Sequence, residues 1–288
     1  MKAIYKKELK SYFHSLYAWL FLAVFTAVTG FYYSILCIAY GYADYSQYVF
    51  RQIPILFLII VPILTMRLLS EEKKQKTDQL LYTAPITSGE IVLGKYLATL
   101  TLYALSLVIC LIQALPIQCF GGMNWKTFFT GCIGYFLLGA SLLAIGLFLS
   151  SLTENQLISA ALTLGILIVF LLLPNLTDLL PGRARYSYIC LFLLIIGIGL
   201  YFYDSTKKKG ISAGIVILCT GAVGILAKVK PTIFDNGLSK IVDWFSVFSR
   251  YEDFCVGVLN ASSIIYYISF VLIFLYLTVQ IMERRRWK

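Results

Sequence analysis

The chain of 288 residues is 60% hydrophobic and only 13% charged, and its mean hydropathy is +0.83. These values exclude an ordinary soluble domain and predict an all-α protein that crosses a membrane several times. The formal net charge of +10 fits contact with anionic lipid head groups, and no soluble module rich in basic and aromatic residues indicates a nucleic-acid partner.

The segment 1–16 predicts a helix that lies flat at the membrane interface. Lysines occupy one side, and the other side carries large side chains at helical spacing: Tyr5, Leu9, Tyr12, Phe13 and Leu16. A simple anchor without a mechanical role is the alternative. No compact apolar run ends in a cleavage site here, so we expect no cleaved signal peptide and a cytosolic amino terminus.

Eight later windows are apolar enough to cross the hydrocarbon core, which needs about 20 residues each. They are 17–40, 53–69, 97–120, 128–150, 156–174, 187–203, 211–229 and 262–282. With both termini in the cytosol, this count places about two thirds of the 24 basic residues inside, as the positive-inside rule expects. The glycines between Gly131 and Gly146 predict close packing of helices in the bilayer.

A charged segment, Glu71 to Pro85, follows the second span. Thr77, Leu80, Leu81 and Ala84 recur at i, i+3, i+4 and i+7, backed by Glu71, Glu72, Lys73, Lys74 and Asp78. This pattern predicts a helix over 71–84 that could insert into a groove on a soluble subunit, although any charged inner loop could look similar. Pro85 ends this helix, and the capping box from Thr87 to Glu90 predicts a new helix from Ser88.

The segment 230–261 predicts a helix in or dipping into the outer leaflet, because large side chains recur there at helical spacing: Trp244, Phe248, Tyr251, Cys255 and Val258. An exit gate and a packed extracellular loop are both open interpretations. The seven cysteines are interpreted as small core hydrophobes, and a disulfide between Cys119 and Cys255 is a weaker alternative.

The sequence contains no residue pattern for catalysis, for an ion pathway or for ATP binding. Its single histidine, His14, supports no triad or metal site, the span interiors carry no Asp, Glu, Lys, Arg or His, and no phosphate-binding Gly-x-x-x-x-Gly-Lys-Ser/Thr loop is present. We therefore expect no enzyme activity, no metal and no cofactor in this chain. A partner must supply the energy.

Three stretches resemble the permease subunit of type 2 (ABC-2) ABC exporters, and among them the permeases associated with gliding motility. They are Lys6 to Phe13, Glu71 to Ala98, and Ile264 to Trp287 with its Glu-Arg-Arg-Arg-Trp ending. The family commonly has glycine where this chain has Lys76 and proline where it has Leu16. The common family pattern has six spans, so 187–229 looks like an added hairpin within a single transmembrane domain, 1–288.

The resemblance implies roles for several residues. Tyr5, Leu9, Tyr12 and Phe13 would belong to an elbow helix, and Trp244, Phe248 and Tyr251 to an outer gate. The coupling interface with an ATPase would comprise Glu71, Glu72, Lys73, Thr77, Leu80, Leu81, Thr83 and Pro85.

The resemblance also implies partners and a location in the bacterial inner membrane. The partners are two ABC ATP-binding subunits carrying MgATP and a second permease protomer of the same or a related chain, with an extracellular accessory protein as a further candidate. The 21 Tyr and 20 Phe favour an amphipathic or lipid-like exported substrate. The alternative function is mechanotransmission, in which ATP-driven motion reaches an envelope partner and nothing is transported.

Overall fold

The computed structural model describes residues 1–77, 86–179, 244 and 246–286. Among these residues every regular element is helical. The chain divides into two compact units, Met1–Leu171 with Val247–Lys288, and Leu172–Ser246. Most of the second unit lies outside the described residues, including the predicted hairpin 187–229, and the fold below is that of the first unit.

The first unit contains long helices that alternate in direction. The elements are α1 (Lys2–His14), α2 (Leu16–Tyr33), the π-helices η1 (Ser34–Ala39) and η2 (Ser46–Phe50), the 3₁₀ helix η3 (Ile53–Leu56), α3 (Phe57–Thr65), α4 (Ser70–Lys74), α6 (Ser88–Gly121), α7 (Trp125–Leu152), α8 (Gln156–Leu179, which continues into the second unit), the 3₁₀ helix η5 (Ser249–Tyr251), α12 (Glu252–Cys255) and α13 (Ala261–Arg286).

Six helical stretches of the described chain are long and apolar enough to cross a membrane. They are Leu16–Ala39, Ile53–Lys74, Ser88–Cys119, Trp125–Leu152, Gln156–Pro174 and Ala261–Arg286. Each corresponds to one of the predicted spans, which confirms the all-α, polytopic fold class. The predicted spans 187–203 and 211–229 lie outside the described residues.

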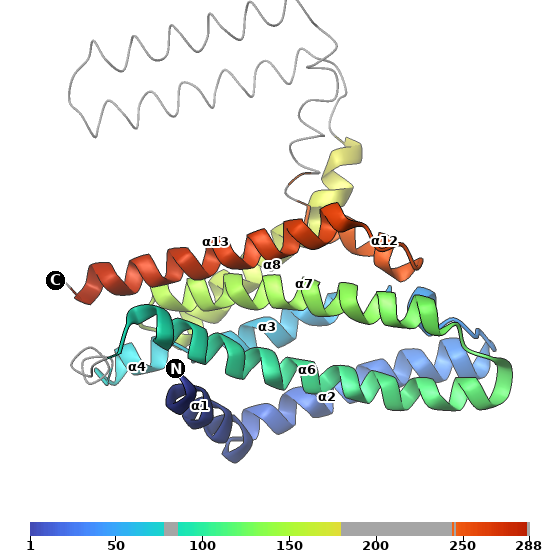
Figure 1. The fold of residues 1–288 in the computed structure, drawn as a ribbon, viewed down its shortest axis with the longest axis horizontal. Coiled ribbons are helices and arrows are strands. Elements are labelled where there is room, and N and C mark those ends of the chain that lie inside the picture. The colour runs from blue at the N-terminus through green and yellow to red at the C-terminus, as the bar shows by residue number, and fades with distance from the viewer. Residues whose placement is uncertain (78–85, 180–243, 245, 287–288) are drawn as a thin grey trace, which may run out of the picture. The chain divides into compact units, whose positions relative to one another are not determined.

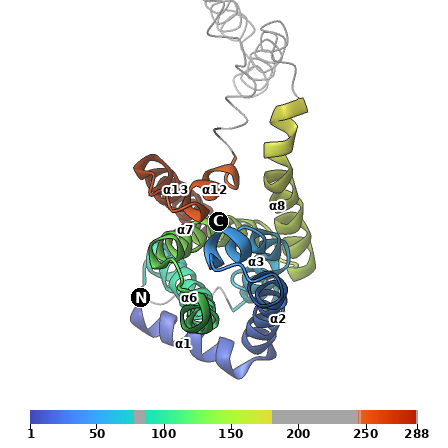
Figure 2. The same ribbon diagram turned by 90° about the vertical axis from the view of Figure 1, so that its right-hand side faces the viewer.

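Helix α1 lies across the bundle (Figures 1 and 2). In Figure 1 the spans run horizontally whereas α1 points along the line of sight, and Figure 2 shows α1 lengthwise beside α6 and α2. We call the end that carries α1 and α4 the α1 end and the opposite one the α12 end. The change in direction occurs at Ser15, whose backbone is extended (φ −98°, ψ 155°). This bend confirms a separate short helix before the first span.

Helix α7 is the centre of the unit, and its glycines set how close the other helices come. A Cβ on Gly139 would lie 2.3 Å from Tyr103 of α6, and one on Gly146 would lie 2.3 Å from Thr65 of α3. At Gly134 the neighbour is Phe254 of α12, at 2.4 Å. These distances are shorter than real side-chain contacts, so only glycine allows this packing. The predicted role of the Gly131 to Gly146 stretch is confirmed.

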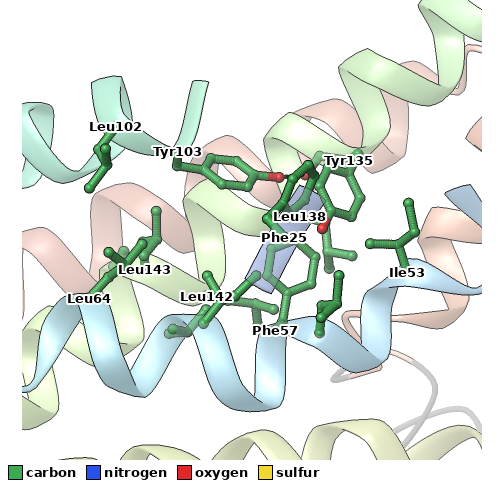
Figure 3. Close-up of a cluster of buried hydrophobic side chains, with 14 of the residues drawn as sticks. Phe25, Ile53, Phe57, Leu64, Leu102, Tyr103, Tyr135, Leu138, Leu142 and Leu143 are labelled. Atoms are coloured by element: carbon green, nitrogen blue, oxygen red, sulfur yellow. Dashed lines mark hydrogen bonds between the residues drawn. The ribbon is translucent and has the colours of Figure 1, made fainter. Parts of the chain in front are cut away.

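Aromatic rings fill the core beside these contacts (Figure 3). Tyr135 of α7 stacks on Phe57 of α3 with ring centroids 4.8 Å apart, and the Tyr103 hydroxyl donates to the Tyr135 carbonyl at 2.6 Å. Phe25, Phe57, Tyr103 and Tyr135 are all buried. These four aromatic residues therefore stabilise the core of the protomer.

The outer segment differs from the single helix predicted for it. Its described part forms two short pieces, η5 and α12, with Phe248, Tyr251 and Cys255 buried. The Tyr251 hydroxyl donates to the Phe50 carbonyl at 3.0 Å, whereas Trp244 is 60% exposed. Phe248 and Tyr251 thus pack as the packed-loop interpretation expects, and a gating role stays a prediction.

Neither Cys119 nor Cys255 forms the disulfide considered above. Both are free thiols, with Cys119 exposed and Cys255 buried. Burial raises the pKa of the Cys255 thiol to about 11, so this side chain stays protonated and behaves as a small hydrophobe.

We predict that Gly139→Ala destabilises the protein by about 1–3 kcal/mol, because the added methyl group meets the buried ring of Tyr103. Thermal unfolding of the detergent-purified protein measures the effect. Gly165→Ala in α8 is the matched control, since no atom lies within 4 Å of a Cβ there. Equal stability of the two variants would contradict the proposed packing.

Candidate functional site

The candidate site is at the α1 end, where α1, α4, the start of α6 and the end of α7 meet. Residues 87–90 set where α6 begins. The Thr87 hydroxyl accepts a hydrogen bond from the Glu90 amide, and the Glu90 carboxylate accepts one from the Thr87 amide, each at 3.3 Å. This reciprocal pair satisfies amides that a helix start leaves unbonded. The predicted capping box and the helix start at Ser88 are confirmed.

A buried lysine connects three segments that are distant in sequence. The Lys95 ammonium on α6 lies 2.9 Å from the Glu8 carboxylate on α1 and 2.8 Å from the Glu72 carboxylate on α4. Its side chain is only 2% exposed, and each glutamate side chain is 15% exposed. We call these three residues the charge cluster. A buried charge is tolerated when opposite charges compensate it, and here both partners come from other helices.

A second polar group lies beside the charge cluster. The Arg67 guanidinium binds both oxygens of Glu71 at 2.6 and 2.9 Å, and it also lies 4.3 Å from the centroid of the Tyr17 ring. Bidentate binding fixes the arginine more firmly than a single contact would. Arg67 and Glu71 line a cavity of about 60 Å³ whose polar wall and size suit a few water molecules.

Tyr12 joins α1 to two spans. Its hydroxyl donates to the Leu64 carbonyl at 2.8 Å and lies 3.3 Å from the Thr99 hydroxyl. Burial raises the pKa of Tyr12 well above its ordinary value, so the phenol remains neutral and keeps its proton for the Leu64 carbonyl.

Helix α4 is also bonded to the end of α7. The Ser150 hydroxyl accepts from the Leu69 and Ser70 amides at 3.1 and 3.2 Å, and the buried Lys73 ammonium donates to the Ser151 carbonyl. The start of α4 therefore has partners on α1, α6 and α7.

The α4 contacts change the interpretation of the charged segment. We expected Glu71, Glu72 and Lys73 to contact a partner subunit, and in this protomer the three side chains already have partners within the chain, in Arg67, Lys95 and Ser151. Lys74, Gln75 and Lys76 are the exposed residues, and Thr77 is partly exposed. Leu80, Leu81, Thr83 and Pro85 lie outside the described residues.

The helix predicted over 71–84 is interrupted in its first half. Helix α4 ends at Lys74, and Lys76 has a φ of +55°, in the left-handed region that favours glycine. The Thr77 amide then bonds back to the Glu72 carbonyl at 2.9 Å. The bend therefore occurs at the position where the resemblance described above implies a glycine, although a lysine occupies it here.

The side of α1 that packs against the rest of the protein agrees only in part with the predicted one. Tyr5, Leu9, Tyr12 and Phe13 are partly buried, as expected for one side of a surface helix. Ile4, which the pattern missed, is the buried residue of α1. Its side chain packs against Gly94 of α6, where a Cβ added to the glycine would lie 3.1 Å from the Ile4 Cγ2 atom. Leu16 belongs to α2 and is 75% exposed.

The sequence pattern also missed the roles of Glu8 and Lys95. Lys95 is one of the basic residues that the predicted topology places in the cytosol, yet its place seven residues into the helix that begins at Ser88 is a usable signal. A lysine that far inside a membrane helix needs a compensating partner. The sequence could not show that the partners are Glu8 and Glu72, because all three come from separate segments.

We predict that Lys95→Met lowers the free energy of unfolding by about 3 kcal/mol, since it leaves two carboxylates close together with only the exposed Lys7 ammonium, 3.9 Å from Glu72, to compensate them. Equilibrium unfolding in mixed micelles measures the change. The triple variant Lys95→Met/Glu8→Gln/Glu72→Gln should recover most of the loss. Lys126→Met, at an exposed position, is the control, and an equal effect of the two single variants would contradict the charge cluster.

We also predict that Lys76→Gly slows hydrogen exchange of the Thr77 amide about fivefold, because glycine avoids the roughly 1 kcal/mol cost of a left-handed backbone. Lys76→Val should accelerate exchange, since a β-branched residue resists this conformation more strongly. Identical exchange in all three proteins would argue against the bend.

A comparison with protein families identifies one match. The model described as "ABC-2 family transporter protein" matches residues 2–282, nearly the whole chain. The search of curated proteins returned no match.

Proposed function

The chain belongs to the ABC-2 transporter family, and from this premise we propose that its α4 segment receives motion from a separate ATP-binding subunit and passes it to the spans through the charge cluster. The family is the membrane component of ABC transporters and is not itself catalytic. The chain is accordingly an integral membrane permease subunit that pairs with an ATP-binding subunit. The route of coupling is our proposal.

The observation that carries the proposal is the buried contact of Lys95 with Glu8 and Glu72. A segment held only by solvent-exposed contacts could shift without moving the spans. Here a displacement of α4 would separate a buried ammonium from its carboxylate unless α1 and α6 moved too, and separating a buried pair is costly. Ser150 and Lys73 extend the same connection to α7.

The docking surface in this proposal begins with Lys74, Gln75 and Lys76, which are exposed. It continues into 78–85, where Leu80 and Leu81 supply the apolar part. The α1 end then faces the cytosol, with both termini on that side, in a bacterial inner membrane. Two ATP-binding subunits would carry MgATP, and a second protomer, of this or a related chain, would complete the transporter.

We propose export of an amphipathic or lipid-like substrate. In the described spans, Asp, Glu, Lys, Arg and His occur only toward the two ends, so nothing there provides for a proton or ion pathway through the membrane interior. No feature of the described residues favours the mechanical alternative.

We predict that Leu80→Asp/Leu81→Asp prevents co-purification of the ATP-binding subunit and leaves membrane insertion intact, because two carboxylates cannot enter an apolar groove without a large desolvation cost. Pull-down from native membranes with quantitative mass spectrometry measures the ratio of the two subunits. Leu259→Asp, at an exposed leucine near the α12 end, is the control.

Reversing the charge of Lys74 and Lys76 should weaken the same association less and in a salt-dependent manner, as exposed charges do. An unchanged subunit ratio in the double aspartate variant, with ATP hydrolysis still coupled in reconstituted vesicles, would overturn the docking role of this segment.

A further inference from the structure

A second site lies near the α12 end, away from the charge cluster. A cavity of about 450 Å³ opens there between α2 with η1 and the last turns of α6. Its main lining residues are Tyr33, Cys37, Ile38, Tyr42, Pro116 and Ile117. We propose that this cavity binds the acyl chain of a membrane phospholipid. The inference concerns a different part of the chain from the coupling segment and does not depend on the proposed function.

A polar clamp holds the two helices together next to the cavity. The Gln113 side chain of α6 accepts from the Tyr45 hydroxyl at 2.8 Å and donates to the Thr29 hydroxyl of α2 at 3.1 Å. Thr29 is fully buried. Beyond this clamp, one helical turn closer to the α12 end, the cavity begins.

Backbone irregularities on both sides accompany the opening. On one side the α-helix changes to the π-helix η1 at Ser34, and Tyr33 and Cys37 project from this transition into the lining. π-Helical turns are rare and are frequent at functional sites. On the other side Pro116 lies inside α6 and cannot donate to the carbonyl one turn earlier. Both irregularities occur where the cavity lies.

The chemistry of the lining selects the ligand. Among the described lining residues none carries a charged side chain, and their polar side-chain groups are the hydroxyls of Tyr33 and Tyr42 and the thiol of Cys37. Such a surface favours a hydrocarbon chain over an ion, a phosphate or a charged peptide. Its volume is within the range of small-molecule sites, about 300–1,000 Å³.

The surroundings of the cavity indicate which molecule supplies the acyl chain. The two spans that border the cavity carry exposed apolar side chains, including Phe31 at 61%, Ile112 at 59% and Leu115 at 48% exposure. In a membrane protein such surfaces contact lipid, so the molecule that can enter from the side is a bilayer lipid. The stacked pair Tyr42 and Tyr48, with centroids 4.0 Å apart, lies by the loop where a head group would remain.

The test is photocrosslinking of the full-length protein in phospholipid nanodiscs that contain phosphatidylethanolamine with a diazirine at the acyl end. We expect adducts to concentrate on the peptides that contain residues 33–43 and 116–117. Ala43→Trp places a large ring at an exposed lining position and should reduce these adducts about tenfold, a loss of about 1.4 kcal/mol of binding free energy. Ala27→Trp, at an exposed position of α2 outside the cavity, should leave them unchanged.

An even spread of adducts over all exposed span surfaces, or equal labelling of the Ala43→Trp and Ala27→Trp proteins, would overturn the proposal. Crosslinking of Cys37 to another copy of the chain by a bifunctional thiol reagent would overturn it too, since it would assign the cavity to a second protomer.

The unaltered protein provides a second measurement that does not depend on the folding of a variant. Cys37 lines the cavity, whereas Cys119 is exposed elsewhere and serves as an internal reference. Removal of lipid by detergent exchange should accelerate alkylation of Cys37 relative to Cys119, and added phospholipid should reverse the change. If the ratio of the Cys37 and Cys119 alkylation rates did not change with lipid, the result would contradict a bound acyl chain.

Discussion

The close approach of neighbouring elements to α7 is the constraint on which the rest of the described fold depends. Inside a bilayer, burial of apolar surface gives little preference for protein over lipid, so association rests on van der Waals packing and hydrogen bonds. Gly134, Gly139 and Gly146 remove the side chains that would prevent such packing, and Phe254, Tyr103 and Thr65 occupy the space. Three segments from different parts of the chain are thereby positioned against one helix.

This packing gives the α1 end a rigid support. Because α3 and α6 are fixed on α7, the residues that extend from them, Arg67 and Lys95, have defined positions near the edge of the bundle. Glu8 and Glu72 then bind Lys95 from two short helices that have little core of their own. The arrangement separates two kinds of charge: those bonded inward hold α4 in place, and those on Lys74 and Lys76 remain available to a partner.

The two polar contacts between spans have different consequences because of their depth and chemistry. The charge cluster at the α1 end joins ionised groups, so its separation is costly, and it suits the transmission of motion. The clamp of Gln113, Thr29 and Tyr45 joins neutral groups inside the bundle, where each bond contributes about 1 kcal/mol or less. It holds α2 to α6 one helical turn before the cavity for which we propose an acyl chain.

The sequence by itself determined the features that depend on neighbouring residues. The spans follow from apolar length, the start of α6 from the Thr87 and Glu90 pair, and the separate α1 helix from its amphipathic period. Only the tertiary structure decided which charges of the 71–77 segment face inward, that Phe248 and Tyr251 pack in the core, and that Lys95 has two carboxylate partners. A periodic pattern shows which residues share a face but not what that face meets, and those partners come from segments that folding alone brings together.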